Sequence, residues 1–212
     1  MLPNASGKHR SSVDGFSEAR GASLIFARAH SWEEIETVWL IQWAKSRSEK
    51  NAFGVPIPNF AQVTRNIYRG ALPDEAGYRG LIEKVGVARV CSIIEHEVRA
   101  DRERALAAGI EEWRHIAFSD TDAPDAARVH EWLDYIRTAD TQGALFTHCR
   151  GGRHRTGTLI GVYRVTDCGW TKEQAYGEMQ KYGWYSALGH RPLLDWFFYK
   201  FDPKDYARDG HG

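Results

Sequence analysis

The sequence has little cysteine, no long apolar run and no excess of charge of either sign. Three cysteines among 212 residues are too few, and odd in number, for a disulfide scaffold, so free thiols in a reducing compartment are expected. No apolar run approaches the roughly 18–20 residues of a membrane span. The longest candidate, ASLIFA at 22–27, is shorter than a signal-peptide core of about 7–15 residues. We therefore expect a soluble, cytoplasmic protein without a membrane span.

The charge balance excludes another group of functions. Lys+Arg and Asp+Glu number 28 each, so no overall basic surplus attracts nucleic acid or anionic membranes. Hydrophobic residues make up 42% of the chain and aromatic residues 12%, which is a globular composition. The length suits one domain with a substantial core. A single globular domain with no nucleic-acid partner is expected.

The chain divides into three segments by composition. Residues 1–30 are rich in Gly, Ser, Arg and Asn without periodicity and are expected to form a flexible N-terminal arm. Residues 31–58 are expected to hold a helix and a linker, because Ser31 and Glu34 form a capping box before an apolar stripe and three Gly/Pro positions follow. Residues 59–212 are expected to form the domain that carries the chemistry.

Strands alternate with helices after residue 60. Strands are predicted at 67–69, 87–94, 113–118 and 144–148. Helices are predicted at 74–84, 99–108 (stopped by Gly109), 126–139, from about Thr156, 171–182 (opened by a Thr171/Gln174 capping box) and 192–201. This alternation predicts an α/β fold in which helices flank a central, mostly parallel sheet.

One Gly-rich segment, HCRGGRHRTG at 148–157, lies between a predicted strand and a predicted helix. Ligands of α/β sheets bind beyond the carboxyl ends of such strands. Gly151 and Gly152 allow the backbone to curl so that several N–H groups point inward and bind an anion. The helix from Thr156 adds its positive N-terminal end, and the planar guanidinium of Arg155 suits phosphate oxygens. The segment therefore predicts a phosphate cradle.

The same electric field should make Cys149 reactive. Helix N-termini and nearby cations lower a thiol pKa from about 8.5 to roughly 3.5–7.5, which yields a nucleophilic thiolate. Cys91, inside a predicted strand, and Cys168, at a predicted helix end, are expected to be packing residues. For Cys91 the alternative of a resolving thiol that protects oxidised Cys149 stays open. The histidines at 96, 115 and 130 lack metal-ligand spacing, so no metal site is expected.

The order His-Cys, five residues, Arg, Thr, Gly resembles the signature loop of the cysteine-dependent protein tyrosine and dual-specificity phosphatases. RHRTG at 153–157 looks like the Lys-His-Arg-Thr-Gly of the plant-and-fungal atypical dual-specificity branch. The upstream pairs and triplets Asn59-Phe60, Tyr68-Arg69-Gly70 and Leu72-Pro73 are similar to the first strands of these small enzymes. The resemblance covers about 59–200, and it implies a protein tyrosine phosphatase-like fold with no metal or organic cofactor.

The resemblance also implies roles for individual residues. Cys149 would be the nucleophile, Arg155 would bind phosphate and stabilise the transition state, and His148 would tune the thiolate. Thr156 would assist hydrolysis of the intermediate. Substrate would be bound by Arg150, Gly151, Gly152, Arg153, His154 and Thr156. Phosphate, sulfate or vanadate is accordingly expected in the loop at 149–155.

The general acid is expected on the segment FSDTDAPD at 118–125. The family pattern, in which a strand ends in an apolar residue, one spacer and then the acid, favours Asp120. Asp122 fits an alignment shifted by two residues and stays an alternative. Asp125 precedes a predicted helix and is the natural N-cap.

These features predict a phosphatase that hydrolyses phosphate monoesters through a cysteinyl-phosphate intermediate, with phosphotyrosine or dual-specificity protein substrates. An inositol phosphate or phosphoinositide substrate is the alternative, because Arg150 and Arg153 correspond to lysines of the lipid-phosphatase loop. Those two arginines and His154 would then meet additional phosphates. A non-catalytic phosphate-binding module is the alternative from another class, and the intact Cys149 and Arg155 argue against it.

Overall fold

The computed structural model describes residues 53–185 and 189–208. The arm expected at 1–30 and the helix expected at 31–50 lie outside the described residues. All described residues belong to one compact unit. Each helix in the described ranges is too short or too polar to cross a membrane.

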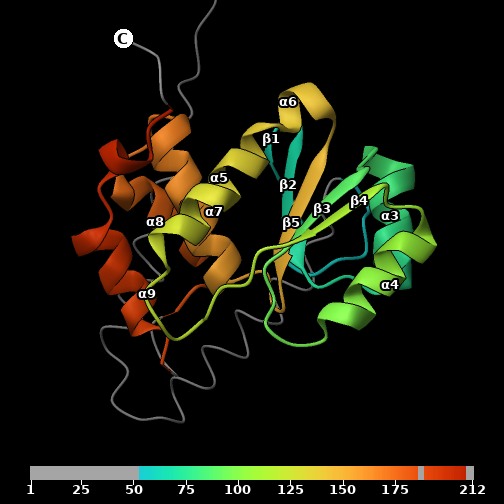
Figure 1. The fold of residues 1–212 in the computed structure, drawn as a ribbon, viewed down its shortest axis with the longest axis horizontal. Helices are drawn as coiled ribbons and strands as arrows, with labels where there is room; N and C mark the ends of the chain where they lie inside the picture. The colour runs from blue at the N-terminus through green and yellow to red at the C-terminus, as the bar shows by residue number, and fades with distance from the viewer. Residues whose placement is uncertain (1–52, 186–188, 209–212) are drawn as a thin grey trace, which may run out of the picture. The chain divides into compact units, whose positions relative to one another are not determined.

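A five-stranded sheet forms the centre of the domain (Figure 1). Its order is β1-β2-β5-β3-β4, and only the β1–β2 pair is antiparallel. The strands are β1 (Ala61–Thr64), β2 (Ile67–Ala71), β3 (Arg89–Ser92), β4 (Glu112–His115) and β5 (Leu145–Cys149). The predicted α/β fold with a mostly parallel sheet is therefore confirmed, while β1 was not predicted from the pattern.

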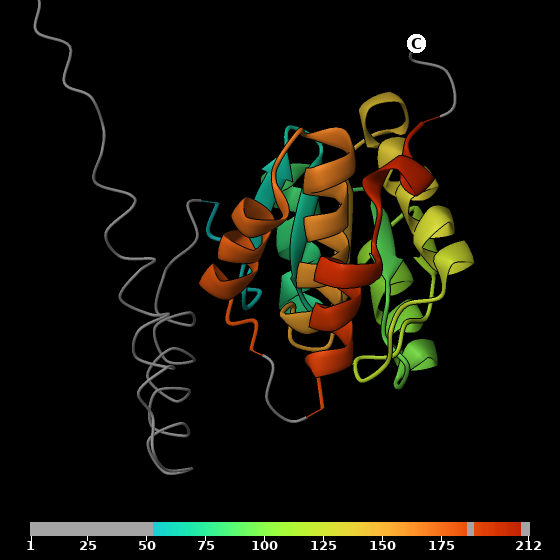
Figure 2. The same cartoon turned by 90° about the vertical axis from the view of Figure 1, so that its left-hand side faces the viewer.

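Helices lie on both sides of this sheet (Figures 1 and 2). One side carries α3 (Glu75–Val85) and α4 (Val98–Ala108). The other carries α5 (Ala126–Arg137), α7 (His154–Asp167), α8 (Lys172–Lys181) and α9 (Arg191–Asp195). The described residues also contain three short segments: α6 (Ala139–Gln142), a π-helical turn (Trp196–Lys200) and a 3-10 turn (Pro203–Tyr206).

Local capping signals set several helix ends as the sequence predicts. The carboxylate of Asp125 accepts a hydrogen bond from the N–H of Ala127 and caps α5. Thr171 and Gln174 form the predicted capping box of α8. Gly109 ends α4 in the left-handed conformation, with φ 104°.

Other boundaries differ from the prediction for tertiary reasons. The strand predicted at 113–118 ends at His115 because β4 is an edge strand, and β3, its one partner among the described residues, ends at Ser92. The helix predicted at 126–139 ends at Arg137, and α6 follows as a separate turn. The helix predicted at 192–201 begins at Arg191 and changes to a π-helical turn, closed by the hydrogen bond from Phe201 N to Trp196 O at 2.8 Å.

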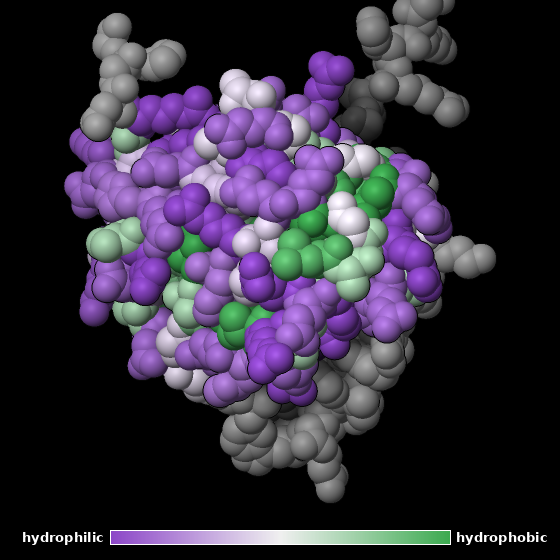
Figure 3. Space-filling model, turned by 45° about the vertical axis from the view of Figure 1, so that its right-hand side comes forward, coloured by the Kyte–Doolittle hydropathy of each residue, from purple (hydrophilic) through white to green (hydrophobic). Residues whose placement is uncertain are grey.

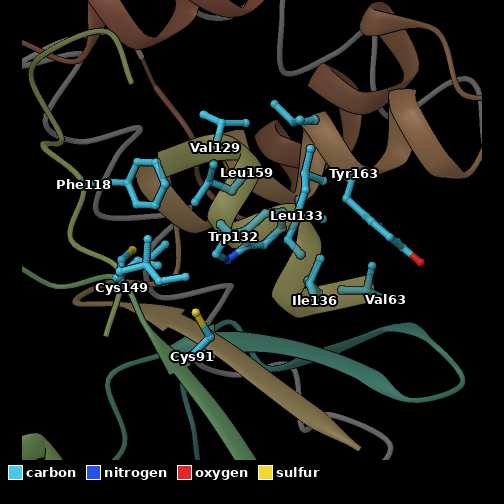
Figure 4. Close-up of a cluster of buried hydrophobic side chains, with 14 of the residues drawn as sticks. Val63, Cys91, Phe118, Val129, Trp132, Leu133, Ile136, Cys149, Leu159 and Tyr163 are labelled. Carbon is cyan, nitrogen blue, oxygen red and sulfur yellow. The ribbon is translucent and has the colours of Figure 1, made fainter. Parts of the chain in front are cut away.

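The apolar side chains form two clusters, one on each face of the sheet. The cluster under α5 and α7 contains Trp132, Leu133 and Leu159 and reaches to Cys149 (Figure 4). Cys91 is fully buried in it, as a packing residue should be. The second cluster joins the sheet to α3 and α4. On the face shown in Figure 3, hydrophilic residues predominate and hydrophobic ones appear in separate groups.

Candidate active site

Cys149 is the last residue of β5, the central strand of the sheet. It pairs in register with Ala71 of β2. On the other side of β5, the carbonyl oxygen of His148 accepts a hydrogen bond from Ile93 N at 2.9 Å. The thiol therefore lies at the carboxyl end of three parallel strands, where α/β folds place their ligands.

The loop after Cys149 has its carbonyl oxygens bound on its outer side. A peptide whose C=O points outward directs the N–H on its other side toward the interior of the loop. These inward N–H groups form the anion cradle. Three donors hold successive oxygens: Leu72 N bonds Arg150 O at 3.2 Å, Asn59 Nδ2 bonds Gly151 O at 2.8 Å, and Arg69 Nη2 bonds Gly152 O at 2.6 Å.

Gly152 is required at its position for two reasons. Its φ is +65°, a conformation that favours glycine. A Cβ there would lie 2.5 Å from the backbone carbon of Gly70 and 2.6 Å from the N of Ala71. The loop therefore packs directly against the backbone of β2, and this contact admits no side chain.

Helix α7 begins at His154, two residues before the start predicted from the sequence. Its first turn is closed by the hydrogen bond from Gly157 N to Arg153 O at 2.8 Å, so the loop itself supplies the helix N-terminus. This brings Arg155, 8% exposed, back toward the strand ends. Its guanidinium donates to Phe118 O at 3.2 Å and to Glu95 Oε2 at 3.3 Å.

The pKa of the Cys149 thiol is lowered from its ordinary value. Burial alone raises it, but the charge of Arg155 and hydrogen bonds from Thr156 and the backbone of Arg153 outweigh burial. The Thr156 hydroxyl also accepts a hydrogen bond from Cys149 N at 2.8 Å, which ties the two ends of the loop together. The site therefore combines a thiol of lowered pKa with a buried guanidinium, an arrangement that suits a cysteine nucleophile.

A buried carboxylate lies beside His148, the residue that precedes Cys149. Asp101 of α4 lies with its Oδ2 3.4 Å from Nε2 of His148, and both side chains are fully buried. Trp113 Nε1 donates to the same carboxylate at 3.2 Å, and the Tyr78 hydroxyl donates to its other oxygen. Burial raises the pKa of Asp101, but the hydrogen bond and charge of His148, with the Tyr78 hydrogen bond, lower it below the usual range.

The segment between β4 and α5 brings one of its carboxylates to the loop. Asp120 Oδ2 lies 3.6 Å from Arg155 Nη2, and its side chain is 37% exposed. Asp122 instead accepts hydrogen bonds from Ser119 Oγ at 2.8 Å and from Thr121 Oγ1 at 3.4 Å, within its own turn. Of the two carboxylates that the sequence left as alternatives, Asp120 is the one that lies beside Arg155.

The other cationic residues of the loop differ in exposure. Arg150 is largely exposed, and its Nη2 lies 3.9 Å from Glu97 Oε1. Arg153 is half-buried and packs beside Gly183. His154 departs from the expectation that it adds charge for further phosphates. Its ring packs against Trp184 and His190 and, mainly through burial, its pKa falls to about 3, so it is neutral at pH 7.

A groove beside Arg150 and Arg155 mixes apolar, basic and acidic side chains. It is lined by Leu72, Ile94, Glu95, His96, Glu97, Arg150 and Arg155. Two of these are carboxylates that face the arginines of the loop, at the distances given above. Within the described ranges, no group of three or more His, Cys, Asp or Glu side chains could hold a metal ion.

Three residues of the site were not assigned a role from the sequence: Asn59, Arg69 and Asp101. The resemblance included Asn59 and Arg69 as part of the first strands, yet their contacts with the loop span 92 and 83 residues. Asp101 lies on a helix on the opposite side of the sheet from α7 (Figure 1). The sequence offered one signal for the burial of Asp101. It is a charged residue four positions before Ala105, and the two share the buried face of α4.

Fold and site together define a class of protein. A mostly parallel sheet whose central strand ends in a cysteine of lowered pKa, followed by a loop of inward N–H groups, an arginine and a helix N-terminus, is the arrangement of the cysteine-dependent phosphatases. A family model described as "Polymorphic toxin system, DSP-PTPase phosphatase" matches residues 64–168.

Individual relatives agree with this class. Dual specificity protein phosphatase TpbA of Pseudomonas aeruginosa is 30% identical over 128 residues, which are 60% of this chain and 56% of TpbA. Inositol diphosphatase DSP5 of Arabidopsis thaliana is 26% identical over 130 residues, 60% of this chain and 63% of DSP5. The crystal structure of TpbA superimposes with a TM-score of 0.60 at 25% identity, covering 70% of this chain and 88% of that one.

In sequence, in fold and in the arrangement of its site, the chain is similar to the small atypical dual-specificity members of the cysteine-dependent tyrosine and dual-specificity phosphatase superfamily. The matched region spans less than two thirds of the length of TpbA and of DSP5.

Proposed function

We propose that this protein hydrolyses phosphate monoesters with Cys149 as the nucleophile. The observation that carries the proposal is a thiol of lowered pKa beside Arg155, inside a loop whose carbonyl oxygens are bound outward. A module that only binds phosphate gains nothing from a thiolate, because the negative charge of the sulfur repels the bound phosphate. The arrangement is therefore better suited to attack on phosphorus than to binding alone.

The first step forms the cysteinyl-phosphate. The Cys149 thiolate attacks phosphorus, the S–P bond forms, and the P–O bond to the leaving group breaks. The loop N–H groups and Arg155 stabilise the charge on the three phosphoryl oxygens. Asp120, in its protonated form, gives its proton to the leaving oxygen.

The second step releases inorganic phosphate. Water attacks phosphorus and gives a proton to the Asp120 carboxylate, the S–P bond breaks, and the thiolate returns. The Thr156 hydroxyl, already bonded to the Cys149 backbone, stabilises the leaving thiolate. The cycle restores the protonated Asp120 and needs no metal or organic cofactor.

Asp120 is our choice for the acid because of its place beside Arg155. Proximity to the guanidinium brings it to the phosphate that Arg155 binds. The carboxylate of Asp122 instead accepts a hydrogen bond from Ser119 within its own turn. His148 is assigned an indirect part: held by Asp101, it orients the end of β5 that carries the nucleophile.

We propose phosphotyrosine or dual-specificity protein substrates in preference to inositol polyphosphates. The support comes from Glu95 and Glu97, which line the groove and repel additional phosphates, while His154 is neutral. A single monoester on a protein avoids that repulsion. TpbA has been crystallised in complex with pTyr, whereas DSP5 is named as an inositol diphosphatase, so relatives exist for both alternatives. Because Cys149 must stay a free thiolate, we place the protein in a reducing compartment, the cytoplasm.

Turnover of p-nitrophenyl phosphate by the full chain separates an enzyme from a binding module. We expect release of p-nitrophenolate that vanadate inhibits, because vanadate fits the loop at 149–155. Binding of phosphate without any turnover would favour the non-catalytic module.

A substrate panel then tests the acidic groove. The full chain is compared on a phosphotyrosine peptide and on inositol hexakisphosphate, and then as the variant Glu97→Gln. We expect the peptide to have the higher kcat/KM, and Glu97→Gln to raise the kcat/KM of the polyphosphate about two- to fivefold relative to that of the peptide, since one surface charge contributes up to about 1 kcal/mol. Glu103→Gln, on an exposed face of α4, is the control. A higher kcat/KM for the polyphosphate in the unmodified chain would favour the inositol-phosphate alternative.

A further inference from the structure

His190, the residue before α9, connects two parts of the site that are far apart in the sequence. Its side chain is largely buried, with 8% exposed, and its Nδ1 lies 2.7 Å from the backbone oxygen of Asp120. A carbonyl oxygen only accepts, so Nδ1 carries the proton and donates it. The imidazole is thus bonded to the segment that carries the proposed general acid.

The same ring stacks on the phosphate loop. The ring centroids of His190 and His154 are 3.5 Å apart, with planes inclined by 18°. His154 is the first residue of α7 and adjoins Arg155. One imidazole therefore bridges the Asp120 segment and the loop that holds Cys149.

The neighbour of His190 adds a second contact with the acid segment. A Cβ built on Gly189 would lie 3.5 Å from Thr121 Cγ2, so the backbone at 189 packs against the turn at 121. Figures 1 and 2 both show the connection from β4 to α5 passing beside the start of α9. Residues 189 and 190 therefore contact the acid segment at two places, at Asp120 and at Thr121.

The acid segment depends on such contacts because its own structure is irregular. Residues 116–125 form neither helix nor strand. The hydrogen bonds among Ser119, Thr121 and Asp122 shape the turn but do not attach it to the phosphate loop. The position of Asp120 relative to Cys149 must come from outside the segment.

We infer that His190 is a positioning residue that holds the Asp120 segment over the phosphate loop, so that the carboxyl reaches the leaving oxygen. This inference rests on the proposed function. The hydrogen bond from Nδ1 fixes the backbone of Asp120, and the stack on His154 fixes the imidazole relative to Arg155. Proton transfer depends on such placement within hydrogen-bond reach.

Four variants of the full chain separate the contributions of the ring. His190→Ala removes the hydrogen bond and the stack, His190→Phe keeps an aromatic ring without the donor, and His190→Asn keeps a donor near the position of Nδ1. His130→Ala is the matched control, because His130 also stacks on an aromatic ring, Tyr206, at 4.5 Å. Each variant is measured on phenyl phosphate, whose leaving group needs a proton, and on p-nitrophenyl phosphate, whose leaving group does not.

We expect His190→Ala and His190→Phe to lower kcat on phenyl phosphate by about 10- to 100-fold, a part of the roughly 10²–10⁴-fold that a general acid contributes. Their kcat on p-nitrophenyl phosphate should fall far less, and the basic limb of the pH–rate profile should flatten. His190→Asn should recover most of the loss. A purely structural role would lower both substrates together and leave the pH profile unchanged, which would overturn the inference.

A double-mutant comparison tests whether His190 acts through Asp120. In an Asp120→Asn background, His190→Phe should cause no further loss on phenyl phosphate, since the group it positions is gone. Additive losses would overturn the inference while leaving the phosphatase activity intact. If the unmodified chain turns over neither substrate, the proposed function fails and this inference with it. If Asp120→Asn alone shows no leaving-group dependence, the acid assignment fails first.

Discussion

The carboxylate of Asp120 and the guanidinium of Arg155 lie 3.6 Å apart, although 35 residues separate them in the chain. The pair joins the segment after β4 to the first turn of α7. A phosphate bound by Arg155 would therefore be within reach of an acid from a different part of the fold. The proton transfer that we propose depends on that approach.

The nucleophile is tested by Cys149→Ser. Turnover of p-nitrophenyl phosphate should fall at least about a thousandfold, as removal of a catalytic nucleophile does, while vanadate still raises the melting temperature because the loop remains. Cys91→Ser and Cys168→Ser, away from the phosphate, should keep nearly the full rate. Activity of Cys149→Ser within tenfold of the unmodified chain would contradict the assignment.

The lowered pKa of Cys149 predicts the pH dependence of alkylation. Because its pKa is lowered, the Cys149 thiol should react with iodoacetamide at a pH below the one at which an ordinary thiol, with a pKa of about 8.5, begins to react. Burial raises the pKa of Cys91, which should stay unmodified under the same conditions. Peptide mapping by mass spectrometry gives the rate at each cysteine. Equal slow labelling of both below pH 8 would contradict a stabilised thiolate.

Asp120→Asn and Asp122→Asn separate the two candidate acids. We expect Asp120→Asn to slow phenyl phosphate by about 10²–10⁴-fold and p-nitrophenyl phosphate much less, because only the first leaving group needs the proton. Asp122→Asn should affect both substrates alike and mildly, since its carboxylate bonds within the turn. The reverse pattern would move the acid by two residues.

Gly152→Ala and Gly177→Ala form a matched pair of substitutions. Gly152→Ala introduces a Cβ 2.5 Å from the Gly70 backbone at φ +65°, so we expect a lower melting temperature and weaker vanadate binding. Gly177 is inside α8 with no atom within 4 Å of an added Cβ, and its replacement by alanine should stabilise the chain by about 0.5–1 kcal/mol. Thermal unfolding with and without vanadate measures both. A loop that tolerates Gly152→Ala would show that the approach to β2 is not required.

The Asp101–His148 pair predicts how stability changes in acid. The pKa of Asp101 is lowered by folding, so its contribution is present above the unfolded value of about 3.9 and is lost as pH falls through the lower folded pKa. Asp101→Ala leaves the buried donors of Tyr78 and Trp113 without their acceptor, and we expect it to lower the free energy of unfolding by about 1–3 kcal/mol for each donor. Urea unfolding at pH 7 measures the effect of the substitution, and unfolding of the unmodified chain at a series of pH values below about 3.9 follows the loss in acid. Asp134→Asn, at an exposed position of α5, should change stability by less than about 0.5 kcal/mol.

Local sequence signals determined the phosphate loop, several helix ends and the class of fold. The loop motif at 148–157 placed Cys149 and Arg155 in one cradle because the groups lie within ten residues and their geometry follows from glycines and a helix start. Caps such as Asp125 and Thr171 likewise predicted helix ends, since their hydrogen bonds span two or three residues. The alternation of strands and helices was enough to predict the class of fold.

Only the tertiary structure decided which distant groups complete the site. Arg69 and Asn59 bind loop carbonyls more than eighty residues away, and Asp101 reaches His148 from a helix on the opposite side of the sheet from α7. Neither periodicity nor spacing encodes those contacts, because they arise from the order in which strands assemble. The same holds for His154, a cationic candidate in the sequence: burial against aromatic rings makes it neutral, and burial is a property of the folded chain alone.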